Sequence, residues 1–163
     1  MFGSPLALQF KPASVPSTYN LCPGGSTTLV SSLTGSAYQW QVNTGSGFVN
    51  VTDNANYSGS NTASLKVINP PGSFYGYQYR CVVDGSNSSI VVIKFVTTFT
   101  GVVSSAWEVP ANWNCGVLPD ANTDVIMNAG TAVVNSNQSC RSLTTKGTSG
   151  VTVNTGFTLN VTH

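Results

Sequence analysis

Two short segments of this chain place large side chains at every second position, and this pattern constrains the fold more than any other feature. Residues 77–83 carry Tyr, Tyr, Cys and Val at alternate positions, and residues 38–42 carry Tyr, Trp and Val in the same way. Successive side chains of a β-strand point to opposite faces, so each row lies on one face of a strand. Two such rows predict two packed layers of strands with Trp40 and Tyr79 in the core between them.

Short apolar segments separated by turn residues continue this pattern through the first part of the chain. Several short strands with turn signals every eight to twelve residues are typical of a β-sandwich of the immunoglobulin type. We therefore expect an all-β chain in which residues 1–100 form an Ig-like β-sandwich. The expected strands cover residues 2–10 with a continuation at 18–22, and then 26–31, 37–43, 48–52, 64–68, 75–83 and 90–99.

The pattern changes near Gly101, where the apolar segments become very short and are separated by Gly, Asn and Thr. Strands this short bury too little apolar area alone, so they need to stack on neighbours. Residues 101–163 are expected to begin a short β-solenoid resembling a parallel β-helix, with a second small β module, such as a sandwich or compact roll, as the alternative. His163 directly follows an expected strand, so we expect the natural chain to continue beyond it. The expected strands cover residues 124–127, 132–134, 140–145, 151–153 and 158–161.

Several motifs resemble a known class of proteins. Leu-Cys-Pro-Gly-Gly-Ser-Thr-Thr-Leu from Leu21, Tyr-Gln-Trp-Gln-Val from Tyr38 and Tyr-Gln-Tyr-Arg-Cys-Val-Val from Tyr77 are similar to Ig-like repeats in large secreted surface proteins of Bacteroidetes. The spacing Trp-x-x-Pro-x-x-Trp from Trp107, followed by Asp-Val-x-Ile from Asp124, resembles the opening of parallel β-helix segments in the same class. Cys22 departs from the vertebrate Ig pattern because it directly precedes the Pro-Gly-Gly turn. The resemblance implies a structural or adhesive function.

The four cysteines indicate an oxidising compartment. None of them has metal-ligand spacing, and the chain has a single histidine, so disulfides are a better interpretation than a metal site. Four cysteines permit three pairings, and the division into two units favours Cys22 with Cys81 and Cys115 with Cys140. Reduced, buried thiols are the alternative.

Charge and hydropathy exclude two classes of partner. Charged residues make up 7% of the chain and the formal net charge is +1. The few cationic side chains are scattered and form no basic stripe for nucleic acid. The longest apolar run, residues 90–93, is far shorter than the roughly 20 residues that span a bilayer, so no membrane insertion is expected. We expect the protein at the cell surface or outside the cell.

The acidic residues do not form a pattern that indicates an enzyme, a cofactor site or a metal site. A glycosidase needs two carboxyl groups about 5 to 10 Å apart, one of them with a raised pKa. Only Asp120 and Asp124 are neighbours, and they are simply interpreted as a turn residue and a strand-entry residue. Clustered oxygen ligands for calcium are also missing, although Asn side chains and backbone carbonyls leave that alternative open. The acidic residues are Asp53, Asp84, Glu108, Asp120 and Asp124.

Aromatic residues are the remaining candidates for ligand binding. Trp107 and Trp113 could stack on sugar rings, but the nearby prolines and cysteine favour the interpretation that they close the end of the solenoid. Tyr57 and Phe48 are secondary candidates for a ligand-binding face.

The sequence favours a non-catalytic structural or adhesive segment of a large secreted or cell-surface protein. Its expected partners are an extracellular glycan or protein surface and further domains of the same polypeptide. The alternatives are a carbohydrate-binding accessory region of a secreted polysaccharide-degrading enzyme, and a surface subunit of a virion or filament.

Overall fold

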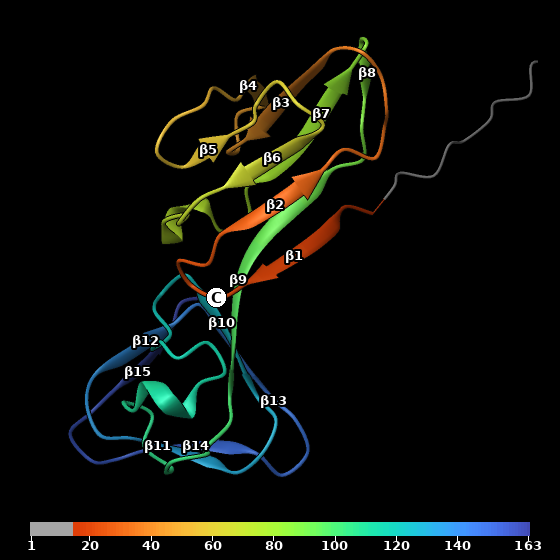
Figure 1. The fold of residues 1–163 in the computed structure, drawn as a ribbon. Helices are drawn as coiled ribbons and strands as arrows, with labels where there is room; N and C mark the ends of the chain where they lie inside the picture. The colour runs from red at the N-terminus through yellow and green to blue at the C-terminus, as the bar shows by residue number, and fades with distance from the viewer. Residues whose placement is uncertain (1–14) are drawn as a thin grey trace, which may run out of the picture.

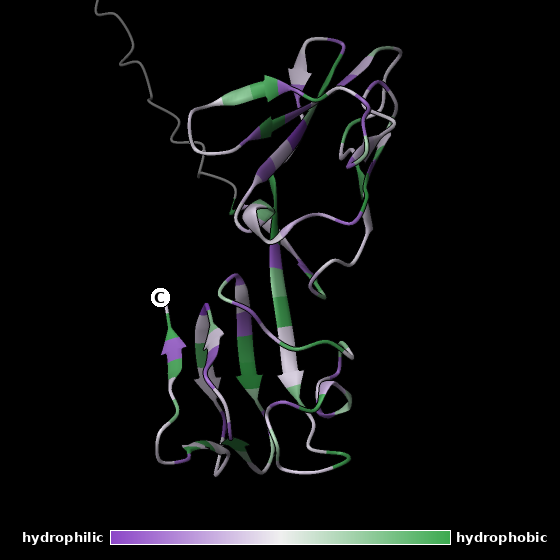
Figure 2. Ribbon diagram, turned by 90° about the vertical axis from the view of Figure 1, so that its left-hand side faces the viewer, coloured by the Kyte–Doolittle hydropathy of each residue, from purple (hydrophilic) through white to green (hydrophobic). Residues whose placement is uncertain are grey.

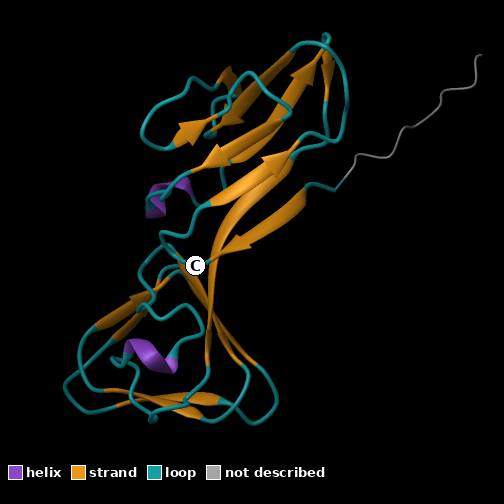
Figure 3. Ribbon diagram, viewed as in Figure 1, coloured by secondary structure: helices purple, strands orange, loops and turns teal. Residues whose placement is uncertain are grey.

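The computed structural model describes residues 15–163, and its regular structure is almost entirely β-strand (Figure 1, Figure 3). The expected edge strand over residues 2–10 lies outside the described residues. Two bodies lie end to end in Figure 1, an upper body built from β1 to β8 and a lower body built from β10 to β15, and β9 runs through both. The described chain contains two short 3-10 turns, η1 (Gly72–Phe74) and η2 (Pro110–Asn112). The protein is therefore all-β, as the sequence predicts.

The upper body contains strands from two sheets. Within the larger sheet, β3 pairs antiparallel with β4 and β7, and β7 pairs antiparallel with β8 and β9. The smaller sheet is antiparallel in the order β2, β6, β5. The larger sheet contributes β1 (Ser17–Leu21), β3 (Tyr38–Asn43), β4 (Phe48–Asn50), β7 (Gln78–Val83), β8 (Ser86–Asn87) and β9 (Val91–Phe99), and the smaller contributes β2 (Thr27–Val30), β5 (Tyr57–Ser58) and β6 (Ser64–Val67).

Alternate residues on the strands of both sheets form the core of the upper body. Trp40 on β3 lies opposite Cys81 on β7 in the strand register. Trp40 is 1% exposed and Tyr79 is fully buried. Leu29 and Leu65 from the smaller sheet belong to the same buried cluster. Burial of large apolar side chains from both sheets stabilises their packing, because each removes a large apolar area from water.

The strands of the lower body pair in parallel because the chain passes twice through the same three positions. Asp124 pairs with Ser142, Thr131 with Gly150, and Gln138 with Leu159. The single strand expected over residues 140–145 is two strands, interrupted at Arg141 where the chain passes from one sheet to another. The strands are β10 (Thr123–Met127), β11 (Thr131–Val134), β12 (Gln138–Cys140), β13 (Ser142–Thr145), β14 (Gly150–Val153) and β15 (Leu159–Val161).

The interior of the lower body is filled by the inward residues of these short strands. Bands of apolar and polar residues alternate along the strands in Figure 2. Trp107 and Trp113, from the segment between β9 and β10, pack into the same interior. The buried cluster consists of Phe99, Trp107, Trp113, Val125, Met127, Ala132, Val134 and Cys140.

Strand β9 belongs to both bodies. Its first half pairs in parallel with β1, from Ser17 with Val91 to Leu21 with Phe95. Its second half pairs in parallel with β10, ending at Met127 with Phe99. The strand that closes the upper body is therefore also the first strand of a lower-body sheet, and no flexible linker separates the two bodies.

Candidate functional site

The contacts between the two bodies gather beside the middle of β9, and we call this region the junction. It is defined by the disulfide between Cys22 and Cys115 and by a polar cluster of Tyr75, Asp124 and Arg141. These residues come from distant parts of the sequence, and each contact joins a segment of the upper body to one that leads into the lower body.

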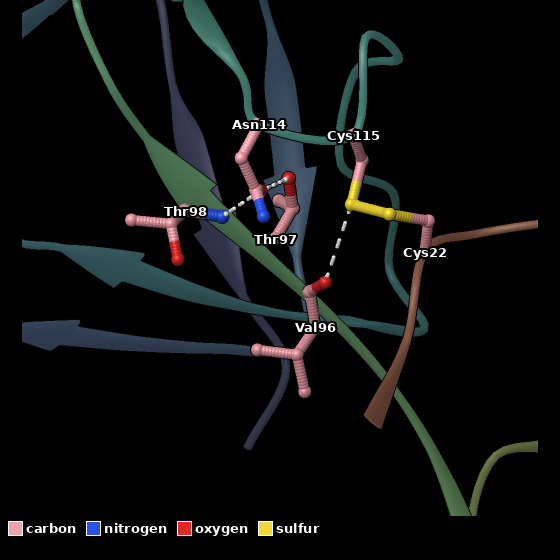
Figure 4. The surroundings of a disulfide bond; sticks show 6 residues. All are labelled: Cys22, Val96, Thr97, Thr98, Asn114 and Cys115. Atoms are coloured by element: carbon pink, nitrogen blue, oxygen red, sulfur yellow. Dashed lines mark hydrogen bonds between the residues drawn. A yellow bond between two sulfur atoms is a disulfide. The ribbon is translucent and has the colours of Figure 1, made fainter. Parts of the chain in front are cut away.

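The disulfide lies along one edge of β9. Cys22 follows β1, and Cys115 follows Trp113 and Asn114, which lie alongside the second half of β9. The two Cα atoms are 5.4 Å apart, within the usual range for a disulfide. Figure 4 shows the pair next to Val96, whose carbonyl oxygen is 3.5 Å from the Cys115 sulfur. A bonded sulfur carries no hydrogen, so this is a packing contact and donates nothing.

Asn114 fixes the position of the Cys115 segment on β9. Its backbone N–H donates to the Thr98 carbonyl at 3.0 Å. Its side-chain oxygen accepts hydrogen bonds from the Thr97 hydroxyl at 3.0 Å and from the Thr98 backbone N–H at 2.7 Å (Figure 4). The Asn114 side chain thus pairs with the Thr98 backbone N–H, a donor at the edge of β9 that would otherwise be unpaired. These hydrogen bonds hold Cys115 within reach of Cys22.

This pairing corrects the one expected from the sequence. Cys81 and Cys140 are unbonded and buried. Cys81 lies at the level of Ser88, with which it shares two hydrogen bonds, whereas Cys22 follows Leu21 at the level of Phe95. Seven residues of extended chain separate these levels, which amounts to roughly 20 Å at about 3.3 Å per residue. Cys22 therefore lies too far along β9 to bond with Cys81.

The polar cluster forms the second contact of the junction. Asp124, on β10, accepts hydrogen bonds from the Tyr75 hydroxyl, from the Arg141 guanidinium at 3.0 Å and from the Ser142 hydroxyl at 2.6 Å. The same guanidinium lies 3.9 Å above the Tyr75 ring in a cation–π contact. Tyr75 belongs to the upper body, so one carboxylate and one cation tie the two bodies together.

The ionisation of the cluster follows from its contacts. Burial alone would raise the pKa of Asp124, but the hydrogen bonds from Ser142, Tyr75 and Arg141 outweigh burial, and the pKa is lowered. Burial, together with the neighbouring Asp124 carboxylate, raises the pKa of Tyr75 to about 12. The cluster therefore holds an ionised carboxylate and a neutral phenol at neutral pH.

A close approach of backbone and side chain completes the junction. Gly72, at the start of η1, lies so near Asn122 that a Cβ atom added to the glycine would be 2.5 Å from the amide nitrogen. Contacts below 3.0 Å force one partner to move, and Asn122 is two residues before Asp124. A side chain at position 72 would therefore require the Asn122 side chain to move.

Three of the remaining acidic residues close loops. Asp53 accepts backbone hydrogen bonds from Gly59 and Ser60, and these bonds, with the Ser60 bond as the largest cause, lower the pKa of Asp53. Backbone hydrogen bonds likewise lower the pKa of Asp84. The pKa of Glu108 is lowered because its hydrogen bonds, the largest from the Asn135 backbone, outweigh the raising effect of burial.

Asp120 and Asp124 have different partners, although they are near in sequence. Asp120 accepts hydrogen bonds from the Asn122 backbone N–H at 2.9 Å and the Thr123 hydroxyl at 2.7 Å, which closes a turn before β10. Asp124 is engaged at the junction. Neither arrangement resembles a pair of carboxyl groups facing a common substrate.

The two tryptophans proposed as sugar platforms are in the core of the lower body. Trp107 and Trp113 are 0% and 2% exposed, and their ring centroids are 4.7 Å apart in an edge-to-face contact. The Trp113 indole N–H donates to the Trp107 carbonyl at 2.8 Å, and Phe99 packs edge-on against Trp113. Stacking on a sugar needs an open ring face, which neither residue offers.

The secondary aromatic candidates are also engaged. Tyr57 is 8% exposed, and its hydroxyl oxygen is 3.1 Å from that of Tyr79 inside the core. Phe48 lies at the surface, but the Arg80 guanidinium is 4.1 Å from its ring centroid. Arg80 is itself held by a hydrogen bond to Gln41 at 2.8 Å.

Asn112 is a structural residue that the sequence reasoning missed. It is fully buried, and its side-chain oxygen accepts from the backbone N–H groups of Val103 and Ser104 at 3.0 and 2.9 Å. Its amide donates to the Ala106 carbonyl at 2.7 Å and to the Ser104 hydroxyl at 3.0 Å. This side chain organises the segment between β9 and β10. The sequence signal that could have indicated this role is the position of the asparagine directly between Pro110-Ala111 and Trp113.

Burial also explains why the two free thiols are poor nucleophiles. Burial raises the pKa of the Cys81 thiol, and burial together with the Asp124 charge raises the pKa of Cys140 to about 11. The thiolate is the reactive form of cysteine, so both groups are chemically quiet at neutral pH.

The surface of the described residues includes two shallow hollows of moderate size. One has a volume of about 350 Å³ and is bordered by Phe99, Ser104 and Thr131, and the other has about 290 Å³ and is bordered by Asn43 and Tyr75. Neither is lined by an acidic, histidine or cysteine side chain. Among residues 15–163, no three His, Cys, Asp or Glu side chains gather in a possible metal site. Nor does that part of the chain include a helix with the length and apolar character to cross a membrane.

Comparison with known proteins adds no relative: no protein-family model matches the chain, and no curated protein matches it either. The junction is thus the arrangement in the described residues that most needs a functional explanation.

Proposed function

We propose that this chain is a non-catalytic structural and adhesive segment of a large secreted or cell-surface protein, and that it acts as a rigid connector. In this proposal an Ig-like sandwich is held at a fixed angle to the first turns of a β-solenoid. The single observation that carries the proposal is that β9 belongs to both bodies, pairing with β1 and β7 in one and with β10 in the other. A shared strand leaves no joint about which the bodies can turn freely.

The Ig-like interpretation of the upper body is supported by its strand order. The sheet order β4, β3, β7, β9 with β1 on the other edge of β9, facing the sheet of β2, β6 and β5, matches the arrangement of a sandwich with Greek-key connections. Trp40 occupies the buried position expected for the core tryptophan. Leu29, on β2 of the facing sheet, is buried in the same cluster as Cys81.

The solenoid interpretation of the lower body is supported by its register. Three parallel pairs, β10 with β13, β11 with β14 and β12 with β15, follow one another in the same order on successive passes of the chain. Parallel stacking of short strands around one apolar interior is the property that defines a β-helix. A second sandwich would need antiparallel pairs between consecutive strands.

An extracellular location is supported by the disulfide, because such bonds persist in oxidising compartments and are rare in the cytosol. The acidic side chains are engaged in loop closure and at the junction, which supports a structural rather than a catalytic function.

The connector proposal is tested by the spread of distances between the two bodies. Non-cysteine spin labels at Val49 in the upper body and Val153 in the lower body, which are 60% and 40% exposed, give the distance distribution by pulsed electron resonance. A label pair at Val30 and Val49, within the upper body, is the matched control. We expect the two distributions to be equally narrow. A broad or multi-peaked distribution between the bodies, with a narrow control, would contradict a rigid connector.

A further inference from the structure

We infer that the Cys22–Cys115 disulfide diverts tension around the upper body when the chain is stretched. This inference rests on the proposed connector function, since a connector on a surface is pulled from both sides. The bond joins residues that are 93 positions apart. The shortest covalent path through the protein therefore enters at β1, crosses the disulfide, and leaves towards β10. Residues 23–114 form a closed loop beside this path.

The path follows β9 through both bodies. Both β1, which precedes Cys22, and β10, which follows Cys115, pair in parallel with β9, so they run in the same direction. Figure 1 shows β1 and β10 following the upper and lower parts of β9 in turn. The disulfide bridges the gap between the end of one strand and the segment that leads into the other. Tension therefore enters the upper body only through β1, and the other strands of its two sheets lie off the path.

The closed loop contains the whole core of the upper body apart from β1. Strands β2 to β9, with Trp40, Tyr79 and Cys81, lie between the two bonded cysteines. Because noncovalent strand pairing gives way long before a covalent bond, a chain pulled at both ends cannot extend these residues while the disulfide is intact. The surface of the upper body keeps its shape under a load that would otherwise unfold it.

The lower body is exposed to the load. The last strands, β13, β14 and β15, lie on the path beyond Cys115, and β15 pairs with β12 over three residues. These turns are the part that extends first, so the lower body yields and lengthens while the upper body remains folded. The two bodies thus respond differently to one force, and a single covalent bond sets the difference.

Reduction switches this protection off. A dithiol reductant supplies two electrons and two protons, the sulfur–sulfur bond breaks into the Cys22 and Cys115 thiols, and the reductant becomes a cyclic disulfide. Cys22 is exposed, so the bond is open to attack while the protein is folded. Once it breaks, the path of tension runs through residues 23–114.

The test is to stretch single molecules of the full chain, held by handles at both ends, and to measure the total gain in contour length on complete unfolding. The sequence separation of 93 between the two bonded cysteines corresponds to roughly 310–330 Å of extended chain, at about 3.3–3.6 Å per residue. We expect the contour-length gain to exceed that of unreduced wild-type protein by this amount when dithiothreitol is added to folded protein held at low force. The same increase is expected in the double variant Cys22→Ser with Cys115→Ser. Adding reductant to folded wild-type protein keeps the test valid if that variant does not fold.

Cys81→Ala is the matched control, because Cys81 is unbonded and its loss leaves the path unchanged. An equal contour gain with and without reductant would overturn the inference. If Cys22 were instead bonded to Cys81, Cys81→Ala would release that loop without reductant. The contour length of unreduced Cys81→Ala would then exceed that of unreduced wild-type protein by roughly 200 Å, at about 3.4 Å per residue, and this result would also overturn the inference. The spin-label experiment is independent of this result: a broad distance distribution removes the connector function, whereas an unchanged contour length removes the diversion of tension.

Discussion

Replacing Asn112 is the sharpest test of how the segment between β9 and β10 is held in place. Its side chain makes four hydrogen bonds from a fully buried position, two as acceptor and two as donor. Asn112→Ala removes all four and leaves the backbone N–H groups of Val103 and Ser104 and the carbonyl of Ala106 without these partners. A buried polar group that loses its partner costs about 1–3 kcal/mol.

The total cost is expected near the low end of that range for each group, because neighbouring Val102 and Val103 are 79% and 65% exposed and water can reach part of the segment. Three groups at about 1 kcal/mol each lower the free energy of unfolding by about 3 kcal/mol. Asn112→Asp keeps the acceptor but places a carboxylate oxygen against the Ala106 carbonyl, so it is also destabilising at pH 7.

Urea denaturation followed by tryptophan fluorescence measures this change, because Trp107 and Trp113 are buried beside Asn112. The control is Asn20→Ala, since Asn20 is exposed on β1 and surface substitutions usually change stability by less than about 0.5 kcal/mol. If Asn112→Ala and Asn20→Ala have the same unfolding midpoint and slope, the buried hydrogen bonds do not hold this segment, and the reasoning is wrong.

Three further predictions concern stability. Cys22→Ser with Cys115→Ser lowers the free energy of unfolding by about 4–5 kcal/mol on the chain-entropy model for a loop of 93 positions, and reductant then has no further effect on the denaturation curve. Trp40→Ala costs about 3–5 kcal/mol as a core truncation, and a melting temperature within a degree or two of the parent would show that the site is not in the core. Because the folded-state pKa of Asp124 is lowered, its contribution is present above the unfolded value of about 3.9 and is lost as pH falls through the folded value. Acid titration of Asp124→Asn should therefore show a shallower loss of stability below about pH 4 than the parent does, and equal slopes would contradict this.

The strands and the core tryptophan could be predicted because they follow from local patterns. Residues 38–42 and 77–83 alternate with period two. Strand β3 includes the first set, with Trp40 buried, and β7 covers residues 78–83 of the second. The short segments after Gly101 likewise correspond to β10, β11 and β14. Alternation identifies a strand and its inward face without any knowledge of what the strand pairs with.

The disulfide could not be predicted because it depends on where β9 ends. The pairing expected from the sequence, one bond within each unit, requires the two units to be separate. The structure instead continues β9 past the upper body, and this brings the end of β1 next to the residues that follow Trp113. No local pattern encodes the extension of a strand into a second sheet.

Which faces of the candidate aromatic residues are open to solvent could not be predicted for a related reason. Trp107 and Trp113 were recognised from their spacing with Pro110 as residues that could close the lower body or bind a sugar. Their mutual packing and the hydrogen bond between them depend on the fold of the segment that Asn112 holds. A sequence identifies such aromatics but not which face of each ring remains open.

The central claim is that one covalent bond crosses from the upper body to the segment leading into the lower body. Protease digestion of the unreduced protein, with free thiols blocked beforehand under denaturing conditions and the peptides identified by mass spectrometry, tests it directly. We predict one cross-linked peptide pair containing Cys22 and Cys115, with blocked thiols at Cys81 and Cys140. A cross-link between Cys22 and Cys81, or blocked thiols at all four positions, would contradict the account.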